Sequence, residues 1–133
     1  MAQTKVDLLA HAIALAEGFY AGDSLPYRIH NPGDLELGDR GWGTDANKTV
    51  YPKADPDADI SDWTDGYSAL RREIHAIFAG ASRVYTTADT FGQLAAKWTG
   101  GDNPGAWCKI VTDNLGVSPF DKLGDWYNEQ QLW

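Results

Sequence analysis

A long segment without helical periodicity, residues 19–59, divides this chain and constrains its fold more than any other feature. The segment is rich in Gly, Pro, Asn and Asp, which favour turns and interrupt regular elements. An amphipathic segment precedes it and several helical patterns follow it. We therefore expect an irregular lobe held between helices.

Residues 5–17 have the apolar spacing of one helix face. The apolar positions recur at intervals of three and four, and they are Val6, Leu9, Ala12, Ile13 and Ala16. Thr4 can cap the start of this helix through its hydroxyl. Gly18 can end it, because glycine readily adopts positive φ. The pattern predicts a helix that places Glu17 in its last turn.

Two short fragments in the irregular segment, residues 34–37 and 48–51, can pair as a small β-ribbon around intervening glycines. Helical patterns return at Thr64 and recur to the end of the chain. Three of these helices have a residue that can cap their start. The predicted caps, in chain order, are Thr64 or Asp65 for the first helix, Thr87 or Asp89 for the second, and Asp102 or Asn103 for the third. Gly116 is a predicted stop, and Ser118 with the following proline is expected to open a short last helix. The chain is therefore predicted to be one mostly-α domain of the α+β class, residues 1–133.

The composition and charge of the chain argue against several classes of function. The 133 residues carry a formal charge of −8, which argues against nucleic-acid binding, because phosphates require Lys and Arg. No apolar run reaches the roughly 20 residues of a membrane span, and charged residues interrupt the N-terminus, so we expect neither membrane insertion nor a signal peptide. The single cysteine, Cys108, excludes an internal disulfide, and the three histidines show no metal-ligand spacing. We expect no metal and no cofactor.

Glu17 is the first candidate for chemistry. A carboxyl surrounded by apolar residues is hard to ionise, because desolvation penalises the charged form. Leu15, Ala16 and Phe19 flank Glu17 in the sequence. The C-terminal end of a helix also disfavours negative charge. Such a carboxyl can act as a general acid in glycoside cleavage. The alternative is an ordinary solvated glutamate in a last helical turn.

The loop at residues 27–35 concentrates hydrogen-bonding side chains around an Asn-Pro-Gly turn. Tyr27, Arg28 and Asn31 could face Glu17 across a groove and bind N-acetyl groups and hydroxyls. On spacing alone, an ordinary structured turn is an equally good interpretation.

These residues bear a family resemblance. Glu-Gly-Phe starting at Glu17, followed by Arg28-x-x-Asn31 and then Pro-Gly-Asp-Leu, resembles the lysozyme-like domains of phage and prophage wall-degrading and virion proteins. Residues 65–70, 87–104 and 110–117 are similar to later motifs of that family, in the same order. The resemblance covers roughly residues 8–117. It departs from the family at His30 and Asp34, where the family has asparagines, and residues 38–59 match no part of the family.

The resemblance implies a lysozyme-type fold and cleavage of the β-1,4 bond between N-acetylmuramic acid and N-acetylglucosamine in peptidoglycan. Glu17 would be the acid, Tyr27, Arg28 and Asn31 would position the substrate, and Tyr67 and Trp98 would line the groove. The partner would be the glycan strand, and the protein would work as a monomer or as part of a larger phage or virion assembly. It would be made in the cytoplasm and act on the wall from the periplasm.

The type of cleavage depends on a second carboxylate. A retaining hydrolase needs one about 5–5.5 Å from the acid, and an inverting hydrolase about 6.5–9.5 Å. The candidates are Asp34, Glu36, Asp39 and Asp45, and Asp34 is preferred because the turn can direct it into the cleft. A lytic transglycosylase needs only the single acid, because the 6-hydroxyl of the substrate closes an anhydro ring.

Two other functions remain open from the sequence. One is a non-catalytic glycan-binding or structural module of the same fold in a virion or secretion machine. The other is an acidic interaction protein, for instance an inhibitor whose charge mimics a substrate. The charge of −8 favours both slightly, because a bacterial wall is itself anionic.

Overall fold

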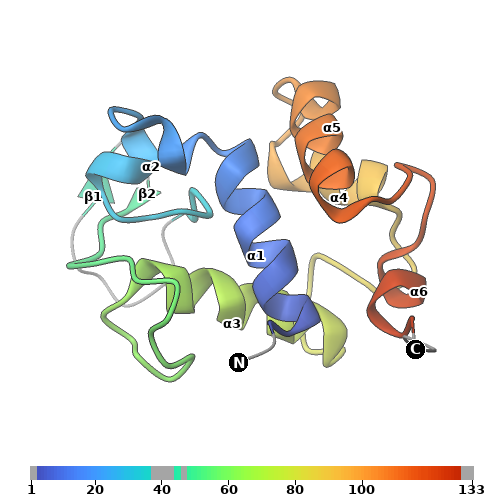
Figure 1. Ribbon diagram of the computed structural model, residues 1–133, viewed down its shortest axis with the longest axis horizontal. Helices are drawn as coiled ribbons and strands as arrows, with labels where there is room; N and C mark the ends of the chain where they lie inside the picture. Colours follow the sequence, from blue (N-terminus) through green and yellow to red (C-terminus); the bar gives the residue numbers. More distant parts are fainter. Residues whose placement is uncertain (1–2, 37–43, 46–47, 130–133) are drawn as a thin grey trace.

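The computed structural model describes residues 3–36, 44–45 and 48–129 (Figure 1). These residues form a mostly helical α+β arrangement with one two-stranded antiparallel ribbon. The elements in chain order are α1 (Lys5–Ala16), the 3-10 helix η1 (Phe19–Ala21), α2 (Leu25–Arg28), β1 (Thr44–Asp45), β2 (Lys48–Thr49), α3 (Gly66–Phe78), α4 (Phe91–Trp98), α5 (Pro104–Leu115) and α6 (Leu123–Tyr127). None of the helices in the described ranges has the length and apolar character to cross a membrane.

Helix α1 is the centre of the molecule. It lies between a lobe that carries α2, β1 and β2 and the pair formed by α4 and α5, and it packs against α5 and α3 (Figure 1). A capping box between Thr4 and Asp7 starts the helix, as Thr4 was predicted to do. The predicted apolar face is buried, and Ala10 and Ala14 are buried as well, so α1 is enclosed on more sides than a surface helix.

The small lobe contains the predicted ribbon only in part. Lys48 pairs with Asp45 across the β1–β2 ladder and forms an isolated bridge with Glu36. The bridge corresponds to the predicted pairing of residues 34–37 with 48–51, although Leu37 lies outside the described residues. The lobe therefore holds Lys48 between two backbone segments.

The Asn-Pro-Gly turn is packed tightly against α3. A Cβ added at Gly33 would lie 2.7 Å from Leu70 Cδ1, and one added at Gly66 would lie 1.8 Å from the carbonyl oxygen of His30. The backbone amide of Gly66 also donates to the carbonyl of Lys53. Close packing of the loop on α3 therefore fixes the position of the residues that follow the turn.

Of the four helix starts predicted after residue 59, two are correct and two are wrong. Asp65 caps α3 and Asn103 precedes α5, which ends at Gly116 as predicted. Helix α4 begins at Thr90 rather than at Thr87 or Asp89, because Thr90 forms a capping box with its own third residue while Asp89 closes the preceding turn. Helix α6 begins after Lys122 rather than at Ser118, whose amide bonds a side chain in a separate turn.

Candidate active site

Glu17 lies where the sequence predicted, at the C-terminal cap of α1. Its backbone amide still donates to the carbonyl of Ile13, and Gly18 then turns the chain with a φ of 77°. The carboxyl is half-buried and lines a cavity of about 470 Å³ together with Asp34, Trp98 and Trp107. The end of α1 thus delivers one carboxyl into a concave surface.

The surroundings of Glu17 favour its protonated form. Burial raises the pKa of Glu17 from 4.5 to about 7, and the negative charge of Asp34 adds to the rise. A hydrogen bond from Trp107 Nε1 to Glu17 Oε2, at 3.1 Å, and the positive charge of Lys48 oppose it. Desolvation is the largest of these effects, so Glu17 retains a large protonated fraction near neutral pH.

Trp107 is one of three site residues that the sequence prediction missed, and the others are Lys48 and Tyr85. Trp107 lies on α5, ninety residues from Glu17 in the sequence. It is almost fully buried, but its indole N–H reaches the carboxyl. The signal available in the sequence was general: a buried Trp usually finds an acceptor for its N–H.

Asp34 follows the Asn-Pro-Gly turn and faces the same cavity. Its φ of 52° places it in the left-handed region, where a non-glycine residue is uncommon. Lys48 Nζ lies 3.3 Å from Asp34 Oδ2 and donates to the Asp34 carbonyl oxygen at 3.0 Å. Burial raises the pKa of Asp34, and the charge and hydrogen bond of Lys48 oppose that rise. Among the described residues, none donates to the buried Oδ1 of Asp34.

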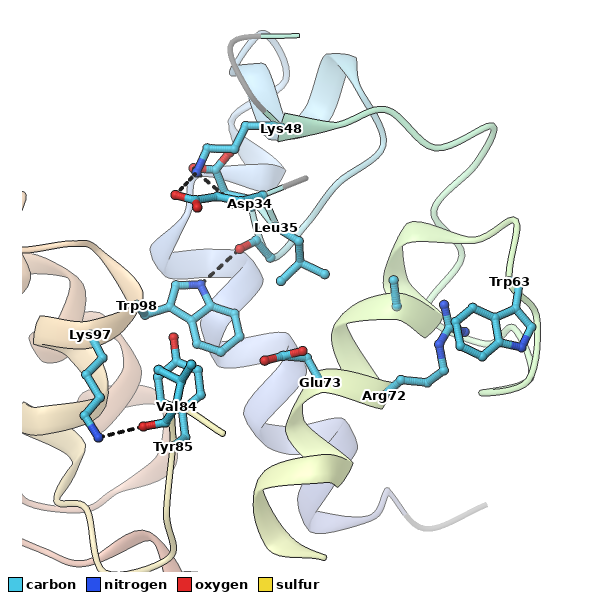
Figure 2. A pocket seen from close by; sticks show the side chains of 13 residues that line it. Asp34, Leu35, Lys48, Trp63, Arg72, Glu73, Val84, Tyr85, Lys97 and Trp98 are labelled. Carbon is cyan, nitrogen blue, oxygen red and sulfur yellow. Dashed lines mark hydrogen bonds and ion pairs between the residues drawn. The ribbon is translucent and has the colours of Figure 1, made fainter. Parts of the chain in front are cut away.

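A second cavity of about 630 Å³ adjoins the first, and the two form one groove. Figure 2 shows this second cavity, with Lys48 and Asp34 on one wall and Tyr85 and Lys97 on the opposite wall. The residues common to both cavities are Asp34, Glu36, Lys48, Lys97 and Trp98. Trp98, which donates from Nε1 to the carbonyl of Gly33 at 3.0 Å, ties the helical side of the groove to the turn.

Three aromatic side chains lie one after another along the groove. The ring centroids of Tyr85 and Trp98 are 5.5 Å apart, and those of Trp98 and Trp107 are 6.1 Å apart. Both pairs are tilted, and the three side chains line the groove from one cavity to the other. Aromatic faces are suitable surfaces for the apolar faces of sugar rings.

The structure brings together three of the seven predicted site residues, Glu17, Asp34 and Trp98, and places the other four elsewhere. Asn31 is fully buried, and its amide group bonds the backbone of Leu35 and Thr49, so its polar atoms hold the loop instead of facing a ligand.

Tyr27 and Arg28 are exposed on α2 and are not among the described residues that line either cavity. The structure therefore does not place either of them at the groove beside Glu17. Tyr67 is buried and bonds Tyr20 through the hydroxyl groups at 2.9 Å. It lines a separate cavity of about 210 Å³ beside His11, because α3 presents it to the other side of α1.

Of the remaining candidates for a second carboxylate, the structure describes the side chain of Glu36. Glu36 is exposed and lies 3.8 Å from Lys48 Nζ, at the edge of the groove. Asp39 lies outside the described residues, as does the side chain of Asp45. Within the described ranges, no cluster of three or more His, Cys, Asp or Glu side chains could hold a metal ion.

The groove therefore combines one carboxyl that resists ionisation, a second carboxyl beside a lysine, and a row of aromatic rings. Comparisons of the chain with protein-family models, with curated proteins and with solved structures find no match in any of the three.

Proposed function

We propose that this protein is a lysozyme-like glycosidase that cleaves the β-1,4 bond between N-acetylmuramic acid and N-acetylglucosamine in peptidoglycan. The observation that carries the proposal is Glu17, a half-buried carboxyl with a pKa of about 7 at the wall of a long groove. Glycoside cleavage needs a carboxyl that is protonated at working pH and accessible to the substrate. Glu17 meets both requirements.

The chemistry assigned to Glu17 is proton donation. As the bond between the anomeric carbon and the bridging oxygen breaks, the Glu17 proton passes to that oxygen, which leaves as a hydroxyl. Positive charge then develops on the sugar ring. Asp34, which lines the same cavity, is the candidate to stabilise that charge or to accept a proton from the attacking water. Trp107 holds the Glu17 carboxyl through its N–H and fixes the direction of the transfer.

The groove supports a glycan as the substrate class. Its two adjoining cavities extend on both sides of Asp34 and Trp98, which suits an extended chain rather than a small ligand. Tyr85 and Trp98, whose rings are partly exposed, offer ring faces along that path, and the buried Trp107 continues the row behind Glu17. The choice of peptidoglycan among glycans comes from the family resemblance of residues 8–117.

A non-catalytic glycan-binding module of the same fold is the second candidate. The observation that favours it is the charge of −8, which disfavours association with an anionic wall. A binding module needs the groove and its aromatic rings, but it does not need a protonated Glu17. Cleavage therefore discriminates between the two proposals.

The test is the release of soluble fragments from purified peptidoglycan by the wild type, by Glu17→Gln and by the control Glu129→Gln. Glu129 is exposed and lies far from the groove, in a long ion pair with Lys5. We expect the wild type and the control to release fragments, and Glu17→Gln to be at least about a hundredfold slower. No fragments from the wild type would refute the enzyme, and full activity in Glu17→Gln would refute the role of Glu17.

A further inference from the structure

We propose that Lys48 is a positioning residue of the active site: its ammonium group orients the Asp34 carboxylate and balances its charge in the groove that Glu17 also lines. The inference rests on the proposed glycosidase function and adds a residue to it. It stands on the geometry of the groove wall, where β2 places Lys48 against the turn that carries Asp34.

Lys48 contacts Asp34 in two ways. Its Nζ lies 3.3 Å from Oδ2 and also donates to the Asp34 backbone carbonyl at 3.0 Å. Contacts to both the side chain and the backbone of one residue fix its orientation as well as its charge. Asp34 Oδ2 therefore faces the lysine, while no described residue donates to Oδ1. Oδ1 is itself buried, so the contacts of Lys48 are the ones that orient the carboxylate.

The other cations that line the groove are engaged elsewhere. Lys97 donates to the carbonyl of Val84 at 2.8 Å (Figure 2). It also donates to Asp89 Oδ2 at 2.8 Å. Arg72 donates to the carbonyls of Ile60 and Asp62, away from Asp34. Lys48 is thus the cation that the described part of the chain places against Asp34.

Lys48 offsets two effects that disfavour the ionised form of Asp34. Glu36, across Lys48, and the half-buried position of Asp34 both raise the pKa of Asp34, and Lys48 opposes them. Glu17 lines the same cavity, and the negative charge of Asp34 raises its pKa. Two carboxyls in one site can perform different tasks only if their environments hold them in different protonation states. Burial favours the protonated form of Glu17 against the hydrogen bond from Trp107, and Lys48 favours the ionised form of Asp34 against burial.

The backbone position of Lys48 supports this role. Its pairing with Asp45 in β1 and its bridge to Glu36 secure the main chain on both sides. The side chain is mostly buried in the groove wall, so it has little freedom to turn into solvent. The lysine is therefore anchored at a fixed distance from the turn, as a positioning residue requires.

The first experiment measures protonation without any substrate. The Asp34 and Glu17 carboxyls are titrated by carbon-detected NMR in the wild type, in Lys48→Met, in Lys48→Arg and in the control Lys109→Met. Lys109 forms an exposed ion pair with Asp113 on α5, outside the groove. We expect the titration midpoints of Asp34 and Glu17 to rise in Lys48→Met, and to stay near the wild-type values in Lys48→Arg and Lys109→Met. An unchanged Asp34 midpoint in Lys48→Met would overturn the inference.

The second experiment measures fragment release from peptidoglycan against pH. We expect kcat of Lys48→Met to fall about tenfold or more, with a KM change under about twofold, because positioning acts on the chemical step. The acid limb of the profile moves to higher pH in Lys48→Met, and Lys48→Arg restores it. A Lys48→Met profile identical to the wild type would overturn the inference.

Failure of this inference is distinguishable from failure of the proposed function. If the wild type releases no fragments, the glycosidase proposal fails, and the NMR titration alone decides the role of Lys48. If the wild type is active and Lys48→Met has the same titration midpoints and the same rate of fragment release, the glycosidase proposal is retained and the positioning role of Lys48 is refuted. Circular dichroism of each variant confirms that the fold is retained.

Discussion

Glu17→Gln should make the folded protein more stable, by an amount that depends on pH. At alkaline pH the wild type must keep an ionised Glu17 in a half-buried position, whereas the unfolded chain solvates the same charge. The pKa of Glu17 is about 7 in the folded chain and 4.5 as the ordinary value. At about 1.4 kcal/mol for each pKa unit, the unfavourable burial of this charge costs about 3 kcal/mol. Glutamine keeps an oxygen that can accept from Trp107 and carries no charge.

The direction in which the stability changes with pH follows from the number of protons that each state binds. Between the two pKa values the folded chain binds more protons than the unfolded chain, so wild-type stability falls as the pH rises through this window. Urea unfolding should therefore show Glu17→Gln to be more stable by about 3 kcal/mol at about pH 8, and nearly equal to the wild type at about pH 4. Glu129→Gln, which alters an exposed ion pair, should change little at either pH. An equal stability difference at both pH values would refute the reasoning.

Three further substitutions test the surroundings of the site. Asn31→Ala should lower the free energy of unfolding by about 2–3 kcal/mol in urea titrations, because it removes three hydrogen bonds to the backbone of Leu35 and Thr49 from a fully buried position; a loss under about 1 kcal/mol would contradict the buried placement. Gly66→Ala should cost about 3 kcal/mol in the same assay, since its Cβ would meet the His30 carbonyl; a neutral effect would show that the turn does not lie this close to α3. Trp107→Phe removes a donor to Glu17, so the Glu17 midpoint in an NMR titration should rise, and an unchanged midpoint would exclude the hydrogen bond.

Local patterns explain which parts of the fold could be predicted. The helical spacing of residues 5–17 and the cap at Thr4 depend on neighbours in sequence, so α1 and the position of Glu17 at its end were predictable. Asn103 and Gly116 at the ends of α5 were equally local. Thr90 was missed as a cap because Thr87 and Asp89 have the same chemistry one to three residues earlier, and only the backbone path selects among them.

The candidate site depended on contacts that no local pattern contains. Trp107 reaches Glu17 from α5, and the packing of α1 on α5 decides that meeting. Asn31 lies in the predicted turn, but burial of the turn directs its amide to the backbone instead of the groove. Lys48 became significant only when β2 was placed beside Asp34. Residue type and spacing thus identified the two carboxyls, and tertiary packing determined what surrounds them.

The central claim is that Glu17 donates a proton in glycan cleavage, and the pH dependence of fragment release from peptidoglycan tests it most directly. With a pKa of about 7 for Glu17, kcat/KM of the wild type should fall above about pH 7, by about tenfold for each further pH unit. Glu17→Gln should give only background release at every pH. Wild-type release that continues undiminished to about pH 9, or equal release by Glu17→Gln, would contradict the account.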